Sequence, residues 1–179
     1  MGISSKQATA LIEQLSVLVV DDNAFMRKLV RGMLASLGVK TIYEAADGID
    51  ALESIRANVP DVVILDWEMP LLNGPELVRI VRSPGVFPMP DIPIIMLTGH
   101  TDRRRVLETI SLGVNEMLCK PVSAKALYDR LISILLRPRA QPRSDATLCG
   151  SGESGPVQPV GAGSPAAGSS IKRRRGSGP

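Results

Sequence analysis

The chain has 179 residues, of which 44% are hydrophobic and only 3% aromatic, so aliphatic side chains must fill its core. Its formal net charge is +3, but residues 137–179 hold seven basic and two acidic groups, which leaves 14 basic and 16 acidic groups on residues 1–136. The positive charge therefore belongs to the end of the chain and gives no reason to expect a nucleic-acid-binding fold.

The chain shows no targeting or membrane segment. No apolar run approaches the ~20 residues that span a bilayer. The first residues, Met1–Lys6, do not form a signal peptide, and Lys6 breaks the myristoylation pattern. We therefore expect a cytoplasmic protein.

Residues 4–15 place apolar side chains at helical spacing and predict a short leading helix. Short apolar runs then predict strands that are buried on both faces: Val17–Val20, Val62–Asp66 and Ile94–Leu97. Glu116–Cys119 is predicted to be a short strand. Thr41–Ala45 alternates more in its hydrophobicity and suits a strand at the edge of a sheet.

Helices are predicted after the strands, most of them beginning at a residue that can cap a helix. The expected helices follow Asn23 as far as Gly38, span about Ile49–Ala57, span about Pro75–Arg82 after Asn73, span about Asp102–Leu112 after Thr101, and follow Ser123 to about Leu136. Apolar spacing predicts that Phe25, in the first of these helices, and Ile49, in the second, face the core.

Strands and helices alternate five times, which favours an α/β fold with a parallel sheet and helices on both faces. The first, third and fourth strands are the most apolar. The flavodoxin-like, doubly wound order 2-1-3-4-5 buries those three, so a five-stranded sheet of this order is expected. Residues 138–179 are rich in Gly, Pro and Ser and end in the basic run Lys172–Arg175, so they are predicted to be a disordered tail.

Reactive or charged side chains stand at four strand ends. They are Asp21 with Asp22, Asp66, Thr98 and Lys120. The ends of parallel strands share one edge of a sheet and can converge on one crevice. Three carboxylates repel each other there unless a cation lies among them, and all-oxygen ligation suits Mg²⁺, or Mn²⁺ as a substitute. A carboxylate beside a cation, a hydroxyl and an ammonium group suits phosphoryl chemistry through an aspartyl-phosphate.

Four motifs occur in order, each at a strand end: Asp21-Asp22, Asp66-x-x-Met69-Pro70-x-x-Asn73-Gly74, Thr98-Gly99 and Lys120-Pro121. Together they resemble the response-regulator receiver family of two-component signalling, in particular its stand-alone, chemotaxis-type members. The resemblance covers about residues 15–136. The expected organisation is an extension over residues 1–14, a receiver domain over residues 15–137 and the tail over residues 138–179.

The resemblance implies a role for each of these residues. Asp66 is the phosphoacceptor, and Thr98 and Lys120 contact the phosphoryl group. The implied Mg²⁺ ligands are Asp22 and Asp66 directly, Asp21 through water, and the backbone carbonyl of Glu68. The implied donor is a phosphohistidine on a histidine kinase or a histidine phosphotransfer protein, and the Lys120–Pro121 peptide bond is expected to be cis.

Some neighbours of the site depart from the family's usual residues or vary within the family. Met117 lies three residues before Lys120, where members usually carry a Tyr or Phe that follows the threonine as a rotamer switch. Glu68 and His100 occupy positions that tune phosphoryl lifetime in the family, so we hypothesise that they set the rate of autodephosphorylation. Trp67 resembles the tryptophan beside the acceptor in some chemotaxis-type members.

The leading prediction is a single-domain response regulator that switches partner binding on phosphorylation and catalyses only its own phosphorylation and dephosphorylation. No DNA-binding or enzymatic domain is expected after residue 136, so the output must come from an unknown partner protein. The resemblance implies that the face formed by about residues 102–136 recruits partners, with Arg103, Arg104 and Met117 as candidate contacts.

Two alternatives stay open. The first is an aspartyl-phosphate phosphatase of haloacid-dehalogenase type, although such enzymes usually have Asp-x-Asp where this chain has Asp66-Trp67-Glu68. The second is a phosphate sink that competes for a kinase and has no output.

Overall fold

A computed structural model describes residues 5–100 and 102–137 of the chain. Its elements, in order, are α1 Ser5–Glu13, β1 Ser16–Val20, α2 Ala24–Ser36, β2 Thr41–Ala45, α3 Gly48–Asn58, β3 Val62–Asp66, α4 Gly74–Arg82, β4 Ile94–Thr98, α5 Arg103–Ser111, β5 Glu116–Cys119 and α6 Ala124–Leu135. The predicted tail lies outside the described residues, and the predicted domain bounds stay predictions. Among the described helices, none is long and apolar enough to cross a membrane.

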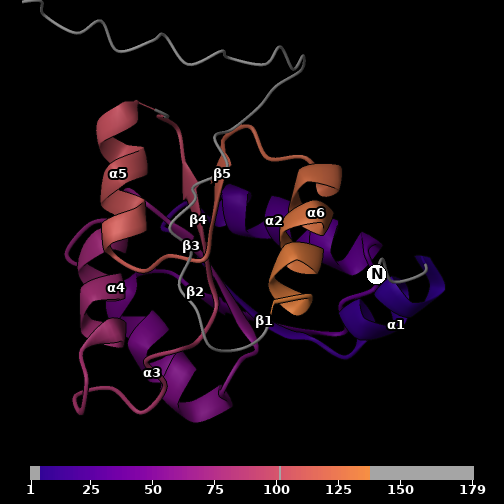
Figure 1. Cartoon of the computed structure of the whole chain (residues 1–179), viewed down its shortest axis with the longest axis horizontal. Helices are drawn as coiled ribbons and strands as arrows, with labels where there is room; N and C mark the ends of the chain where they lie inside the picture. The colour runs from indigo at the N-terminus through magenta and orange to yellow at the C-terminus, as the bar shows by residue number, and fades with distance from the viewer. Residues whose placement is uncertain (1–4, 101, 138–179) are drawn as a thin grey trace, which may run out of the picture.

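The five strands form one parallel sheet in the order β2-β1-β3-β4-β5, which confirms the predicted flavodoxin-like arrangement (Figure 1). β3 and β4 are buried along their whole length, as their continuous apolar sequences predict. β2 is largely exposed or half-buried, as suits an edge strand. All five strands run the same way, so their carboxyl ends share one edge of the sheet.

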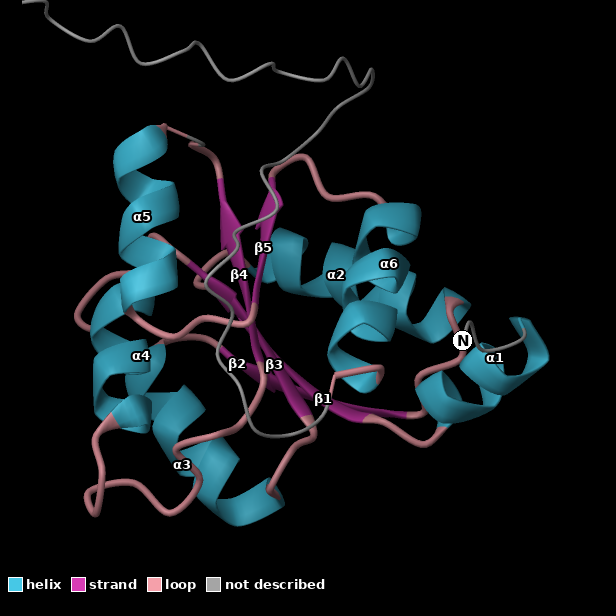
Figure 2. Ribbon diagram, viewed as in Figure 1, coloured by secondary structure: helices cyan, strands magenta, loops and turns pink. Residues whose placement is uncertain are grey.

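Helices cover both faces of the sheet (Figure 2). Side chains alternate across each strand, so Leu18 and Val20 pack toward α3 and α4, whereas Val17 and Val19 pack toward α2 and α6. α1 joins the second of these layers through Ile12, which is fully buried. Burial on both faces fixes the register of the strands and therefore the place of each residue at their ends.

The predicted helix starts are confirmed at Asn23, Asn73 and Ser123, whose side chains accept hydrogen bonds from the first turn of the following helix. The prediction for α5 was wrong by one residue. Asp102, not Thr101, caps this helix, because its carboxylate accepts the N–H of Arg105 at 3.0 Å. Thr101 itself lies outside the described residues.

Some side chains that were predicted to face the core are exposed, among them Phe25 at 71%, Ile49 at 53% and, in the same helix as Phe25, Leu29 at 39%. In α2 the buried side chains are Val30 and Leu34, and Phe25 lies about 140° around the helix from Val30 at 100° per residue. In α3 the buried stripe is Gly48, Ala51 and Ile55, so Ile49 points away from the sheet.

Candidate functional site

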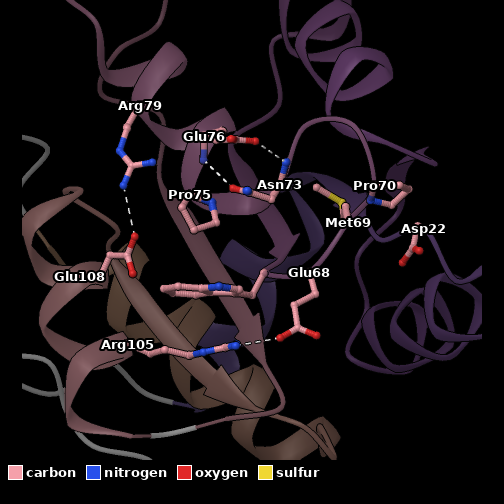
Figure 3. Close-up of a pocket in the computed structure, with 11 residues that line it drawn as sticks. Asp22, Glu68, Met69, Pro70, Asn73, Pro75, Glu76, Arg79, Arg105 and Glu108 are labelled. Atoms are coloured by element: carbon pink, nitrogen blue, oxygen red, sulfur yellow. Dashed lines mark hydrogen bonds and ion pairs between the residues drawn. The ribbon is translucent and has the colours of Figure 1, made fainter.

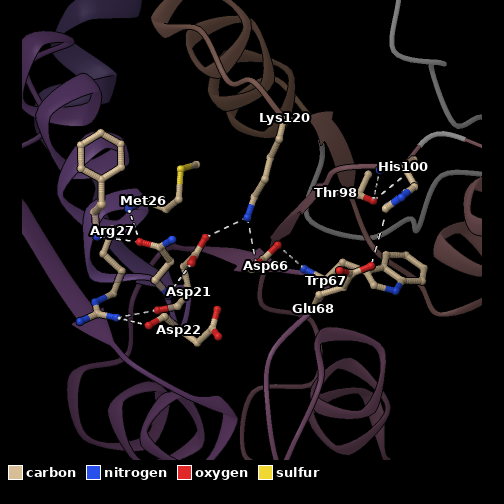
Figure 4. A network of polar contacts seen from close by, with 12 residues as sticks. Asp21, Asp22, Met26, Arg27, Asp66, Trp67, Glu68, Thr98, His100 and Lys120 are labelled. Atoms are coloured by element: carbon tan, nitrogen blue, oxygen red, sulfur yellow. Dashed lines mark hydrogen bonds and ion pairs between the residues drawn. The ribbon is translucent and has the colours of Figure 1, made fainter.

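The carboxyl edge of the sheet brings the predicted acidic residues together. Asp21 follows β1, Asp66 ends β3, and the carboxylates of Asp21, Asp22 and Asp66 offer oxygen atoms that all lie within 4.8 Å of one another. Asp21 and Asp66 are only 1% and 6% exposed, whereas Asp22 is open to solvent. These three carboxylates, two buried and one exposed, form an acidic pocket at the edge of the sheet (Figure 4).

Lys120, at the end of β5, reaches into this pocket. Its Nζ lies 2.9 Å from Asp66 Oδ2 and 3.1 Å from Asp21 Oδ2. The other oxygen of Asp66 accepts the backbone N–H of Trp67 at 2.8 Å. The acceptor carboxylate is thus held on both sides, and the bridging ammonium fixes its orientation.

The charges in the pocket shift the pKa values of its members. Burial raises the pKa of Asp66, helped by the nearby charge of Asp21, and outweighs the hydrogen bond and charge of Lys120. For Lys120, burial alone lowers the pKa, but its hydrogen bonds to Asp66 and Asp21 raise it above its ordinary value. Lys120 therefore stays protonated at neutral pH.

The loop after β1 is held by contacts that the sequence did not predict. Asp21 Oδ1 accepts the N–H of Asn23 at 2.9 Å, which turns the chain into α2. From the first turns of α2, Arg27 donates to the backbone carbonyl of Asp21 at 2.7 Å and to that of Asp22 at 3.3 Å. Arg27 also lies 3.6 Å from Glu44 on β2, so it ties the acidic loop to the edge of the sheet.

The loop after β3 has a tight backbone that depends on Gly74. The N–H of Gly74 donates to the carbonyl of Trp67 at 3.0 Å. A side chain at Gly74 would meet the carbonyl oxygen of Asp66 at 2.4 Å. A capping box between Asn73 and Glu76 then starts α4. The Asn73-Gly74 motif therefore serves to fold the loop back against the acceptor residue.

Thr98 ends β4, next to β3, and is fully buried. Its hydroxyl donates to the backbone carbonyl of His100 at 2.8 Å and accepts the N–H of His100 at 3.1 Å. The structure thus places Thr98 at the same edge of the sheet as Asp66, with its hydroxyl bonded to its own loop.

Beside the acidic pocket lies a groove of about 540 Å³, lined by Trp67, Glu68, Arg105 and residues of α4 (Figure 3). Arg105, from α5, donates to Glu68 Oε1 at 2.8 Å, and its guanidinium carbon lies 5.1 Å from the centre of the Trp67 ring. This contact lowers the pKa of Glu68, mainly through the hydrogen bond. His100 Nδ1 lies 3.8 Å from the same carboxylate.

The residues present fit a divalent cation. Three carboxylates face one ammonium group, so the pocket keeps an excess of negative charge, and carboxylate oxygens are the donors that Mg²⁺ prefers. The Lys120–Pro121 peptide bond is cis, as the family resemblance implied. Met117 is buried beneath α5, where the hydroxyl of Thr109 lies 3.5 Å from its sulfur.

The contacts that Arg27 and Arg105 make near the site were not predicted from the sequence. Arg27 carried no motif signal, although its place four residues after the N-cap of α2 aims it at the acidic loop. Arg105 belonged to the run Arg103–Arg105, of which only Arg103 and Arg104 were singled out. Those two are exposed, whereas Arg105 borders the buried stripe of α5 that holds Val106 and Thr109.

Comparison with known proteins agrees with this geometry. The family model for the response regulator receiver domain matches residues 17–132. The chain is 38% identical over 122 residues to chemotaxis protein CheY1 of Helicobacter pylori, which covers 68% of this chain and 97% of the relative. It is 32% identical over 127 residues to chemotaxis protein CheY-3 of Vibrio cholerae, covering 71% and 96%.

Solved structures give the same result. The chemotaxis protein CheY4 of Vibrio cholerae superposes with a TM-score of 0.61 at 32% identity, over 67% of this chain and 98% of that one. A Francisella response regulator receiver domain superposes with a TM-score of 0.62 at 29% identity, over 68% and 96%. With its strand order, its acidic pocket and these matches, the chain belongs to the response regulator receiver family, and its relatives are of the chemotaxis type.

Proposed function

We propose that Asp66 accepts a phosphoryl group from a phosphohistidine of a histidine kinase or a histidine phosphotransfer protein. A carboxylate oxygen of Asp66 attacks the phosphorus, a P–O bond forms, the P–N bond to the donor histidine breaks, and its electron pair stays on the imidazole nitrogen. In this proposal Lys120 leaves its bridge to Asp21 and pairs with the phosphoryl oxygens.

The observation that carries the proposal is the bridging of Asp66 and Asp21 by Lys120. The ammonium group of Lys120 contacts Oδ2 of Asp66 and Oδ2 of Asp21. It therefore lies beside the oxygen atoms where negative charge grows during the transfer. Asp66 is buried and its second oxygen is held by the N–H of Trp67, so the nucleophile needs little reorganisation.

We further propose that Mg²⁺ binds in the acidic pocket, held by Asp22 and Asp66 directly, by Asp21 through water and by the backbone carbonyl of Glu68. When bound there, the cation neutralises the oxygens of the transferring phosphoryl group. The exposed carboxylate of Asp22 supports this assignment, because it leaves one side of the pocket open for hydrated cations to enter.

Phosphorylation is proposed to change partner binding through Thr98, whose hydroxyl turns to the phosphoryl group. The face of α5, β5 and α6 is the proposed recognition surface, and Arg103 and Arg104 are exposed on it. The output protein itself is not identified by the site. In this proposal the protein acts in the cytoplasm, where it catalyses only its own phosphorylation and dephosphorylation. The family match does not favour the phosphatase alternative.

Trp67 is the only tryptophan of the chain and adjoins Asp66, so its fluorescence reports on the site. We expect a saturable change with Mg²⁺ and a second change with beryllofluoride, a phosphoryl mimic, in the wild type. Asp66→Asn should abolish the second change. A wild type that responds to neither ligand contradicts the proposed function.

A further inference from the structure

The hydroxyl of Thr98 uses its full bonding capacity in the described structure. It has one O–H and two lone pairs. The O–H goes to the carbonyl of His100, and the lone pairs receive the N–H of His100 at 3.1 Å and a guanidinium N–H of Arg105 at 3.4 Å. Any turn of this hydroxyl toward Asp66 therefore breaks existing bonds.

Arg105 is well placed to hold this arrangement. One end of its guanidinium group donates to Glu68 at 2.8 Å and the other end reaches Thr98, while the plane lies near the Trp67 ring. Its side chain is 22% exposed, against 63% for Glu68, so it is the more buried member of the pair. The planar guanidinium group of an arginine can donate to two acceptors and pack on an aromatic ring at the same time, which the ammonium group of a lysine cannot do.

Arg105 also connects the site to the rest of α5. Its backbone carbonyl accepts the hydroxyl of Thr109 at 2.8 Å, and the same hydroxyl lies 3.5 Å from the sulfur of Met117 on β5. A continuous set of contacts thus runs from Thr98 through Arg105 and Thr109 to Met117, the residue that stands where an aromatic switch was expected.

We infer that Arg105 is a positioning residue of the phosphoryl switch, which holds the Thr98 hydroxyl away from Asp66 and links its release to α5. The inference rests on the proposed function. A phosphoryl group draws the Thr98 hydroxyl toward Asp66, and Arg105 then loses one acceptor but keeps Glu68 and Trp67. The Arg105–Thr98 contact exists only in the resting state, so it shifts the equilibrium toward that state.

The test compares beryllofluoride affinity in Mg²⁺, followed by Trp67 fluorescence, in a double-mutant cycle of Arg105→Lys and Thr98→Ala. Arg105→Lys keeps the positive charge beside Glu68 but removes the guanidinium group that donates to both Glu68 and Thr98. We expect Arg105→Lys to bind beryllofluoride about two- to five-fold more tightly than the wild type, the range that one modest hydrogen bond accounts for. In the Thr98→Ala background the same change should leave the affinity unaltered.

Arg56→Lys, at an exposed position on α3, is the matched control and should bind beryllofluoride as the wild type does. A second measurement reads the Thr98 side chain directly: three-bond NMR couplings in the metal-free protein should show more of the alternative rotamer in Arg105→Lys. Unchanged affinity and unchanged couplings in Arg105→Lys, or an equal effect in both backgrounds, overturn the inference. A wild type that ignores beryllofluoride overturns the proposed function instead.

Discussion

The ammonium group of Lys120 lies 2.9 Å from Asp66 Oδ2, yet burial keeps the pKa of Asp66 above its ordinary value. The folded, metal-free protein therefore binds more protons at this carboxyl than the unfolded chain does. The pH window of this effect starts near 3.8, the ordinary pKa of an aspartate, and extends to the raised pKa of Asp66. As pH rises through that window the free energy of unfolding falls, and above it the full penalty remains.

Asp66→Asn should consequently raise the free energy of unfolding of the metal-free protein at neutral pH, because the amide has no charge to bury. The gain should vanish below about pH 4, where Asp66 is protonated in both states. Urea unfolding in a chelator at several pH values measures this. Asp129→Asn, in the exposed pair with Lys125, should change stability by only a few tenths of a kcal/mol, roughly the contribution of such pairs. A wild type more stable than Asp66→Asn at neutral pH contradicts the account.

Mg²⁺ should stabilise the wild type against heat, because the proposed site exists only in the folded acidic pocket. At a concentration of about 100 times Kd the gain is roughly 2.7 kcal/mol. Asp22→Asn removes a proposed ligand that is exposed and outside the core, so its melting temperature should barely respond to Mg²⁺. Asp50→Asn, an exposed acid at the start of α3, should respond as the wild type does. Equal increases in melting temperature with Mg²⁺ in all three proteins would contradict the assignment of Asp22 as a ligand.

Gly74→Ala should both destabilise the protein and weaken the site. The added methyl group would meet the carbonyl oxygen of Asp66 at 2.4 Å, so the loop must shift, at a loss of about 1–3 kcal/mol. Beryllofluoride affinity should fall as well. Gly32→Ala in α2 is the control, because its methyl group meets nothing within 4 Å and alanine favours the helix by up to about 1 kcal/mol. Chemical denaturation measures the free energy of unfolding, which should fall in Gly74→Ala and rise or stay unchanged in Gly32→Ala.

The lifetime of the phosphoryl group should depend on Glu68 and His100, whose exposed side chains stand together at the mouth of the site. Decay requires that a water oxygen attack phosphorus while the P–O bond to Asp66 breaks. Glu68→Asn and His100→Ala each remove bulk from the path of that water, so decay should be several-fold faster. Loss of phosphorylated protein with time, measured after the donor is removed, reports the rate. Phosphorylated Arg103→Ala should lose its phosphoryl group at the wild-type rate. An unchanged rate in Glu68→Asn and His100→Ala would argue against a role of these two residues in dephosphorylation.

The sheet and the acidic pocket could be predicted because few residues decide them. The short apolar runs of β1, β3 and β4 favour buried strands, and the first polar residue after each run is then expected at the shared edge. The positions of Asp21, Asp66 and Thr98 follow from this pattern.

Contacts set by tertiary packing could not be predicted in the same way. The α5 cap moved to Asp102 because adjacent Thr and Asp residues are both good caps, and local sequence does not rank them. Phe25 was predicted to face the core because it is apolar, but the buried stripe of α2 is narrower and does not include it. The hydrogen bonds of Arg105 join α5 to the loop after β3 and to the end of β4, and no spacing along the chain reveals these contacts.

Intact mass after incubation with acetyl phosphate and Mg²⁺ shows whether Asp66 is the phosphoacceptor. The wild type should gain the mass of one phosphoryl group, a chelator should prevent the gain, and Asp66→Asn should gain none. An unmodified wild type, or equal modification of Asp66→Asn, would contradict the assignment of Asp66 as the phosphoacceptor.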